Sequence, residues 1–432
     1  MTIFRSIGLA ALTLGFTASS AWAQDLPKAK TPEEVGFSTA RLKRLSDRIN
    51  EGVKAGELPG AVVLIARNGK VVMHEAFGFR DKDAKAPMKT DTIFRIASMT
   101  KPIVAVATLI LMEEGKLSLA DPVSKYIPAF ADTKVAVKKK NDDGTEEFVQ
   151  ETQKRQMTVQ DLMRHTSGLT YGSGESINKV KLSYMDMKVM VPDQTNAEMV
   201  EKLAKLALLY QPGTHWEYSM AIDVLGRVVE VASGMTLDKF IEKRITKPLK
   251  MVDSGFDAAP EKKDRGAHPQ KEGKKNEAPA IPEVTLKTTW KSGGGGMVST
   301  SADYARFAQM LANGGQLDNV RILSRKSVEL MTSNHLPPDI IMGDDMGAFE
   351  ALEPSARMGQ GFGLTVAVRT DAGRNPLPGS VGDYYWGGAY GTYFWEDPHE
   401  HMYVIFMMQS QTARLPYRYL MRDMVYQSLV GN

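Results

Sequence analysis

The sequence contains no cysteine. This absence excludes disulfide bridges, cysteine nucleophiles and thiolate metal sites, so the fold has to be stabilised by its hydrophobic core. The sequence also has little excess of either charge, because 54 basic residues stand against 51 acidic ones, for a formal net charge of +3. This balance argues against a nucleic acid or a membrane surface as partner. With 432 residues, 43% of them hydrophobic, the chain is long enough for a sizeable core in two lobes.

Long apolar runs are also rare, and outside the N-terminus no segment is long and apolar enough to span a membrane. Residues 1–23 combine Arg5, an apolar run and the small-residue ending Ala21-Trp22-Ala23, which is typical of a secretory signal peptide. We therefore predict cleavage after Ala23 and a periplasmic or secreted protein. The alternative is a membrane anchor, but the apolar run is shorter than the roughly 20 residues that span a bilayer. No stable membrane anchor is expected.

Helical and strand patterns are grouped along the chain. A 3.6-residue spacing predicts a helix within 38–60, and Asn68-Gly69 between two β-rich runs predicts a tight hairpin. A helix that carries Ser98 and ends near Gly115 follows. Further elements are expected as helices over 196–210, 221–245 and 414–430, as strands over 361–370, 391–398 and 401–410, and as solvated charged loops over 138–156 and 261–280.

Strands at both ends and helices between them predict an α+β fold. One antiparallel sheet, flanked by helices, would be built from residues 24–120 and 291–432, and residues 121–290 would form a mostly helical lobe. A cleft between the two lobes is the expected site.

Ser98 and Lys101 are the first candidate catalytic pair. A spacing of three residues on a helix places both side chains on one face, and Pro102 is compatible only with the first helical turn. Ser98 would then lie where unpaired backbone N–H groups can bind an oxyanion. A serine hydroxyl needs a neighbouring base, and Lys101 can act as one if burial keeps part of it neutral. The alternative is a helix cap beside a surface charge; a second Ser-x-x-Lys, Ser176 to Lys179, lies in a glycine-rich loop.

Two further segments contain candidate site residues. Tyr218 follows a proline-glycine turn and precedes a helix, so its phenol can project into a cleft and share the base role, or it can be a buried aromatic. Trp386, Gly387 and Gly388 interrupt an aromatic strand, which is typical of a bulge or of a place where a ligand approaches the backbone. The N–H of Ala389 would then be a second oxyanion donor.

Together these segments resemble the serine β-lactamase and penicillin-binding-protein superfamily. The resemblance rests on Ser98-Met-Thr-Lys101, Tyr218-Ser219 and Trp386-Gly387-Gly388 in that order, and it is strongest to the class C-like branch, especially the family VIII carboxylesterases. It implies a β-lactamase-like fold, Ser98 as acylated nucleophile, Lys101 as its activating partner and Tyr218 as general base or proton relay. The N–H groups of Ser98 and Ala389 would form the oxyanion hole, and residues 386–388 would bind substrate.

The sequence departs from that resemblance at two places. Tyr218-Ser219-Met220 stands where class C β-lactamases have Tyr-x-Asn, and Trp386-Gly387-Gly388 stands where they have Lys-Thr-Gly. Both changes remove groups that bind a β-lactam, and both are usual in the esterase branch. We therefore expect a carboxylesterase that acts on small-molecule, short-chain esters without a cofactor.

Two other functions remain open at this stage. One is a D-Ala-D-Ala-type peptidase or weak β-lactamase, and the other is a catalytically idle protein that binds peptidoglycan or a partner through the same cleft. A metal site at His399-Glu400-His401 is not expected, because no third ligand has suitable spacing. His165 is interpreted as a structural residue near the cleft. The sequence does not predict the oligomeric state.

Overall fold

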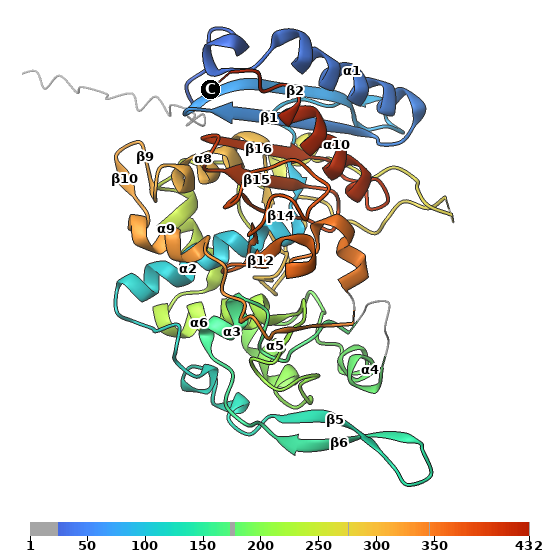
Figure 1. Ribbon diagram of the computed structural model, residues 1–432, viewed down its shortest axis with the longest axis vertical. Helices are drawn as coiled ribbons and strands as arrows, with labels where there is room; N and C mark the ends of the chain where they lie inside the picture. The colour runs from blue at the N-terminus through green and yellow to red at the C-terminus, as the bar shows by residue number, and fades with distance from the viewer. Residues whose placement is uncertain (1–24, 173–177, 275, 345, 432) are drawn as a thin grey trace, which may run out of the picture.

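The structure is a computed structural model that describes residues 25–172, 178–274, 276–344 and 346–431. The fold consists of α-helices packed around one large antiparallel β-sheet (Figure 1). The predicted signal peptide, 1–23, and Ser176 of the second Ser-x-x-Lys lie outside the described residues. No helix in the described ranges is both long and apolar enough to cross a membrane.

The large sheet joins the two ends of the chain, as the sequence predicts. Its centre is the antiparallel pairing of β1 with β16, in which Val62 lies opposite Met407. Asn68 and Gly69 both have positive φ angles, so the predicted hairpin turn between β1 and β2 is confirmed. In spatial order the strands are β12 (Gln360–Phe362), β13 (Ala367–Arg369), β14 (Tyr384–Gly387), β15 (Tyr393–Asp397), β16 (Met402–Met407), β1 (Gly60–Arg67), β2 (Lys70–Asp81) and β3 (Ala86–Pro87).

Helices cover both faces of this sheet, because successive side chains of a strand point to opposite sides. On β15, the ring of Phe394 contacts Tyr304 of α8, whereas the next ring, Trp395, stacks on Tyr426 of α10. The helices are α1 (Thr39–Ala55), α2 (Thr100–Glu113), α3 (Val159–Met163), α4 (Lys179–Asp186), α5 (Asn196–Leu203), α6 (Ala221–Ser233), α7 (Leu237–Ile241), α8 (Ser301–Ala312), α9 (Arg325–Met331) and α10 (Arg414–Tyr426).

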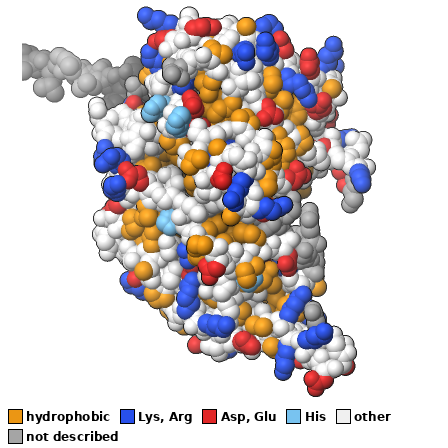
Figure 2. Space-filling model, viewed as in Figure 1, with side chains coloured by type: hydrophobic (Ala, Val, Ile, Leu, Met, Phe, Trp, Pro, Cys, Tyr) orange, Lys and Arg blue, Asp and Glu red, His pale blue; other side chains and the backbone are white. Residues whose placement is uncertain are grey.

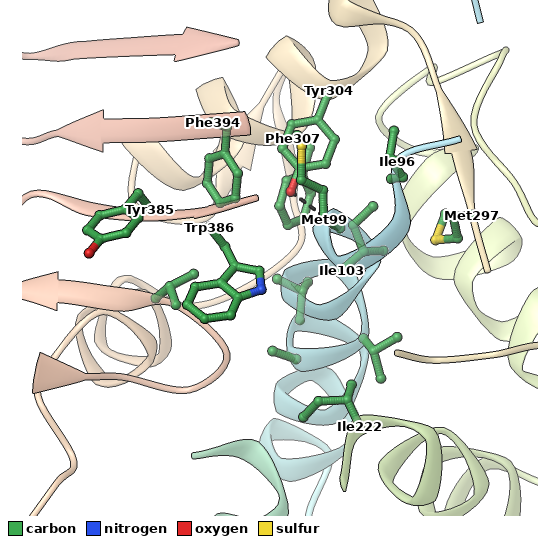
Figure 3. Close-up of a cluster of buried hydrophobic side chains, with 14 of the residues drawn as sticks. Ile96, Met99, Ile103, Ile222, Met297, Tyr304, Phe307, Tyr385, Trp386 and Phe394 are labelled. Carbon is green, nitrogen blue, oxygen red and sulfur yellow. Dashed lines mark hydrogen bonds between the residues drawn. The ribbon is translucent and has the colours of Figure 1, made fainter. Parts of the chain in front are cut away.

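The helix α2 lies between the sheet and α6. Figure 3 shows Met99 at the start of α2 on the side of Tyr304 and Phe307, with Ile222 of α6 farther along the helix. The Tyr304 hydroxyl donates a 3.0 Å hydrogen bond to the Met99 carbonyl, which ties the start of α2 to α8. The packing therefore fixes the segment that carries Ser98 and Lys101 from both sides.

Several boundaries differ from the prediction because tertiary pairing overrides local pattern. Residues 138–156, expected as a loop, contribute to a projecting hairpin of β5 (Lys134–Lys140) and β6 (Glu146–Thr152) (Figure 1). The helix expected over 196–210 ends at Leu203, because the Leu208 amide donates to Lys134 and its carbonyl accepts from Ala136 of β5. Gly234 adopts a positive φ and separates α6 from α7.

The remaining strands are short pairs that hold loops in place. Residues 361–370, expected as one strand, fold back on themselves as β12 and β13, with a turn in which the Gly363 amide donates to the Val366 carbonyl. The other pairs are β4 (Phe94–Arg95) with β8 (Val298–Ser299), β7 (His215–Trp216) with β11 (Ile341–Met342), and β9 (Gln316–Leu317) with β10 (Val320–Arg321).

Lysine and arginine side chains are interspersed with acidic ones over the face shown in Figure 2. This distribution agrees with the near balance of charges in the sequence.

Candidate active site

Ser98 lies in a tight turn that leads directly into α2. Residues Ala97–Met99 form a 3-10 turn, and α2 begins at Thr100 with Pro102 in its first turn, as the sequence predicts. Ala97 has a φ of 43°, a conformation that is strained for a residue with a side chain and that often marks functional turns. Ser98 itself is half-buried.

Lys101 is fully buried and lies directly against the serine. Its Nζ atom lies 3.0 Å from Ser98 Oγ, within hydrogen-bonding distance, and donates hydrogen bonds to the Gly294 carbonyl at 2.6 Å and to the Tyr171 hydroxyl at 3.3 Å. A buried amine is costly unless its protons are bound, and these acceptors fix it beside Ser98. The structure thus brings together the pair that the helical spacing predicts.

The Gly294 carbonyl is held in place by Asp223, a residue that sequence reasoning missed. The buried Asp223 carboxylate accepts hydrogen bonds from Ser292 Oγ at 2.6 Å and from the Gly294 amide at 3.1 Å. Burial raises the pKa of Asp223, and the Ser292 hydrogen bond and the charge of Lys101 partly offset this rise. A Cβ at position 294 would lie 2.4 Å from the Asp223 Oδ2 atom, so only glycine fits there.

Two tyrosines lie beside the Lys101 amine in different ways. Tyr171 receives the hydrogen bond described above, whereas the Tyr218 ring presents its face to the amine, with 4.6 Å between Nζ and the ring centroid. Burial raises the pKa of Tyr171 well above its usual value, and the nearby acidic groups of Tyr218 and Asp223 act in the same direction. Tyr171 therefore stays a neutral phenol, which leaves Tyr218 as the better candidate for proton transfer.

Tyr218 lies in a cluster of aromatic rings, and Trp386 binds its hydroxyl. The Trp386 indole Nε1–H donates to the Tyr218 hydroxyl at 3.3 Å, and the rings of Phe349 and His165 lie 5.5 and 4.7 Å from the Tyr218 ring. Trp386 is thus an almost fully buried partner of Tyr218. An indole N–H stabilises a phenolate but carries no charge for a substrate carboxylate.

His165 is a buried structural neighbour of Tyr218. Its Nδ1 atom lies 3.3 Å from Ser219 Oγ, and its backbone carbonyl accepts from the Glu217 amide. Burial and then the charge of Lys101 lower the pKa of His165 well below its usual value, so the ring is neutral.

The loop that carries His165 is anchored by Asp161. Burial raises the pKa of this carboxyl, but hydrogen bonds from Arg155 and Thr158 outweigh it and bring the value to about 2.

Gly388, which follows the end of β14, allows the backbone there to approach the nucleophile turn. The Gly388 amide donates to the Thr392 carbonyl, and Thr392 Oγ1 donates to the Ile96 carbonyl at 3.1 Å. A Cβ at position 388 would lie 2.4 Å from the Ile96 oxygen. The exposed Ala389 therefore follows a residue that is in contact with the Ser98 turn, where a second oxyanion donor is needed.

The two histidines considered as metal ligands lie in a turn that contributes no residue to the Ser98 site described above. His399 and His401 lie in the turn between β15 and β16, and the His399 side chain is 75% exposed. Among the residues that the structure describes, no group of three histidine or acidic side chains could hold a metal ion.

The two missed residues, Tyr171 and Asp223, lie close to segments that the sequence analysis singled out. Tyr171 follows the segment "HTSGLT", and Asp223 lies in the first turn of α6, shortly after Tyr218. Neither residue belongs to a local motif that would identify a role, because their function depends on Lys101, which comes from a distant part of the chain.

The two tyrosines can be separated by removing each hydroxyl. We predict that Tyr218→Phe lowers kcat/KM for an ester by about 10²- to 10⁴-fold, the usual contribution of a general acid or base. Tyr171→Phe removes one hydrogen bond to Lys101, so a loss of about tenfold or less is expected. Steady-state kinetics of both purified variants measures this difference, and a larger loss in Tyr171→Phe would reverse the two roles.

Comparisons with known proteins agree with this geometry. The Beta-lactamase family profile matches residues 45–422. Protein Rv1367c of Mycobacterium tuberculosis is 36% identical over 84% of this chain and 88% of its own length. Esterase EstB of Burkholderia gladioli is 31% identical over 89% of this chain and 94% of its own length. The structure of EstCE1, described as a hydrolase with promiscuous acyltransferase activity, matches with a TM-score of 0.73 and 26% identity, covering 90% of this chain and 98% of EstCE1.

Proposed function

The chain belongs to the Beta-lactamase family of serine hydrolases, and from that premise we propose that it is a carboxylesterase that forms an acyl-enzyme at Ser98. The observation that carries the proposal is the Lys101 amine, held 3.0 Å from Ser98 Oγ by the Gly294 carbonyl and Tyr171. The similarity to Esterase EstB over nearly the whole chain supports an ester as substrate.

The proposed reaction has two stages. Ser98 Oγ attacks the ester carbonyl while its proton passes to Lys101 or Tyr218, and the N–H groups of Ser98 and Ala389 bind the oxyanion. The bond to the alcohol oxygen then breaks, and the alcohol leaves with that proton. Water attacks the acyl-enzyme, gives the carboxylic acid and returns the proton to Ser98. Across both stages, one ester and one water give one alcohol and one carboxylic acid, and no cofactor is required.

The side chains around Ser98 favour an ester over a β-lactam. Met220 stands where an amide would contact a β-lactam side chain, and it is fully buried in the core. Trp386 stands where a lysine would attract the β-lactam carboxylate, and its N–H is directed to Tyr218. A β-lactam would therefore have fewer of the charged and polar contacts that orient it for attack.

This function predicts a clear preference between two chromogenic substrates. We expect the mature chain from Gln24 onward to hydrolyse p-nitrophenyl butyrate at least about 10²-fold faster than nitrocefin, each measured as kcat/KM by absorbance, since both missing contacts position only the β-lactam. Ser98→Ala is the control for each substrate. Faster nitrocefin turnover would favour the β-lactamase alternative. Ester turnover that persists in Ser98→Ala would contradict the esterase assignment and favour the idle binding protein.

A further inference from the structure

A cavity of about 130 Å³ opens beside the nucleophile turn. Gly295 forms part of its wall, and a Cβ built at this glycine would lie 3.6 Å from the Ala97 carbonyl carbon, next to Ser98. Tyr390, which follows Ala389, lines the cavity too. Gly295 and Tyr390 thus connect the cavity to the two segments that carry the expected oxyanion donors. We call it the Trp290 cavity, and its walls include Pro192, Pro282, Thr288, Trp290, Gly295 and Tyr390.

Arg95 holds the walls of the Trp290 cavity in position. Its guanidinium has five N–H donors, and each makes a hydrogen bond to a backbone carbonyl, which leaves none for a substrate carboxylate. The Trp290 side of the cavity is fixed separately, because the Trp290 amide donates to the Pro192 carbonyl at 3.1 Å. The carbonyls bound by Arg95 belong to Phe256, Pro282, Glu283, Leu286 and Gly296.

The position of the cavity indicates which half of an ester it receives. The alcohol oxygen has to leave beside the group that gives it a proton, and that side of the site is formed by Lys101, Tyr218 and the rings around Tyr218. None of these side chains is among the described residues that line the Trp290 cavity. The acyl chain, which stays on Ser98, therefore has this cavity available.

We propose that the Trp290 cavity binds the acyl group of the substrate and limits its length. This inference rests on the proposed esterase function and adds the substrate class: esters of short, uncharged, mainly apolar carboxylic acids. The walls combine proline rings, the Trp290 indole and glycine backbone with the polar side chains of Arg95, Thr288, Ser292 and Tyr390. All five Arg95 donors are already bound to carbonyls, so the walls offer no free cation to a charged acyl group. A cavity of roughly 150 Å³ takes a benzene ring, so this one has room for about four to six non-hydrogen atoms.

The chain-length profile of p-nitrophenyl esters tests this limit. For the wild-type protein, kcat/KM should be highest near butyrate and fall by about tenfold or more between hexanoate and octanoate. Trp290→Ala should raise the octanoate-to-butyrate ratio of kcat/KM by about tenfold, because it lengthens the cavity, whereas Trp290→Phe should keep a profile close to that of the wild type. Phe349→Ala is the matched control, since it removes an aromatic ring on the Tyr218 side. It should change kcat/KM for esters of every chain length by the same factor.

A second variant acts in the opposite direction and does not depend on the folding of Trp290→Ala. Gly295→Ala adds one methyl group to the cavity wall, and its three nearest atoms, at 3.6 to 3.8 Å, all belong to the Ala97 backbone beside Ser98. The methyl group therefore occupies space between the nucleophile turn and the cavity, where an acyl chain on Ser98 would enter. It should lower kcat/KM for hexanoate by about tenfold relative to acetate.

The outcomes separate this inference from the function on which it rests. Ester turnover that depends on Ser98, with the same chain-length profile in wild type, Trp290→Ala and Gly295→Ala, would overturn the acyl assignment alone. Absence of any turnover that depends on Ser98 would overturn the esterase function and the acyl assignment together. Opposite shifts in the two variants would establish the cavity as the acyl site.

Discussion

Ser98→Ala is expected to reduce ester hydrolysis to the background rate, a loss of about 10⁴- to 10⁶-fold in kcat, as for nucleophiles of other serine hydrolases. The physical reason is that no covalent intermediate can form without the Oγ atom, which Lys101 contacts at 3.0 Å. The measurement is the initial rate of p-nitrophenyl butyrate hydrolysis at saturating substrate. The substitution removes one half-buried oxygen, so the melting temperature should change little.

The matched control for this variant is Ser46→Ala. Ser46 lies on α1, where its hydroxyl donates to Glu75 of β2, and it has no contact with the site. Ser46→Ala should retain the wild-type rate. Retention of more than about one hundredth of the activity in Ser98→Ala would show that another group carries the acyl transfer.

Substitution of Lys101 is expected to have the second largest effect. Lys101→Met keeps the apolar stem but removes the amine, so kcat/KM should fall by about 10²- to 10⁴-fold. The kcat/KM of Lys101→Arg should fall by a similar factor, because a guanidinium keeps its proton and cannot accept the proton of Ser98. Ester kinetics of both variants would be compared, with circular dichroism used to verify that each is folded.

Lys101→Arg separates two possible roles of Lys101. If this variant retained activity within about tenfold of the wild type, Lys101 would act through its positive charge, and Tyr218 alone would be the base. A strong loss in both Lys101 variants supports direct proton transfer by the amine.

The main architecture could be predicted from sequence because its signals are local. The periodicity of α1, the Asn68-Gly69 turn and the apolar strands near the C-terminus each depend on a few neighbouring residues, and one sheet is the simplest way to bury them together. The hairpin of β5 and β6 was missed because its exposed, charged residues have the composition of a loop. Its strands are defined by cross-strand hydrogen bonds and by pairing with Leu208, which composition does not reveal.

The candidate site was only partly predictable for a similar reason. Ser98 and Lys101 are separated by one helical turn, so their contact follows from spacing alone. The group that fixes the amine spans four separate segments, since Tyr171, Asp223 and Gly294 are distant from Lys101 in sequence. The hydrogen bond from Trp386 to Tyr218 was not predicted either, and the expected contact of residues 386–388 with substrate stays a prediction.

Active-site labelling is the most direct test of whether Ser98 is the residue that becomes acylated. The mature protein would be treated with a fluorophosphonate, digested and mapped by mass spectrometry. We predict one phosphonylated residue, Ser98, with labelling blocked by p-nitrophenyl butyrate and absent in Ser98→Ala. A label on any other residue, or ester hydrolysis that continues in the fully labelled protein, would contradict this prediction.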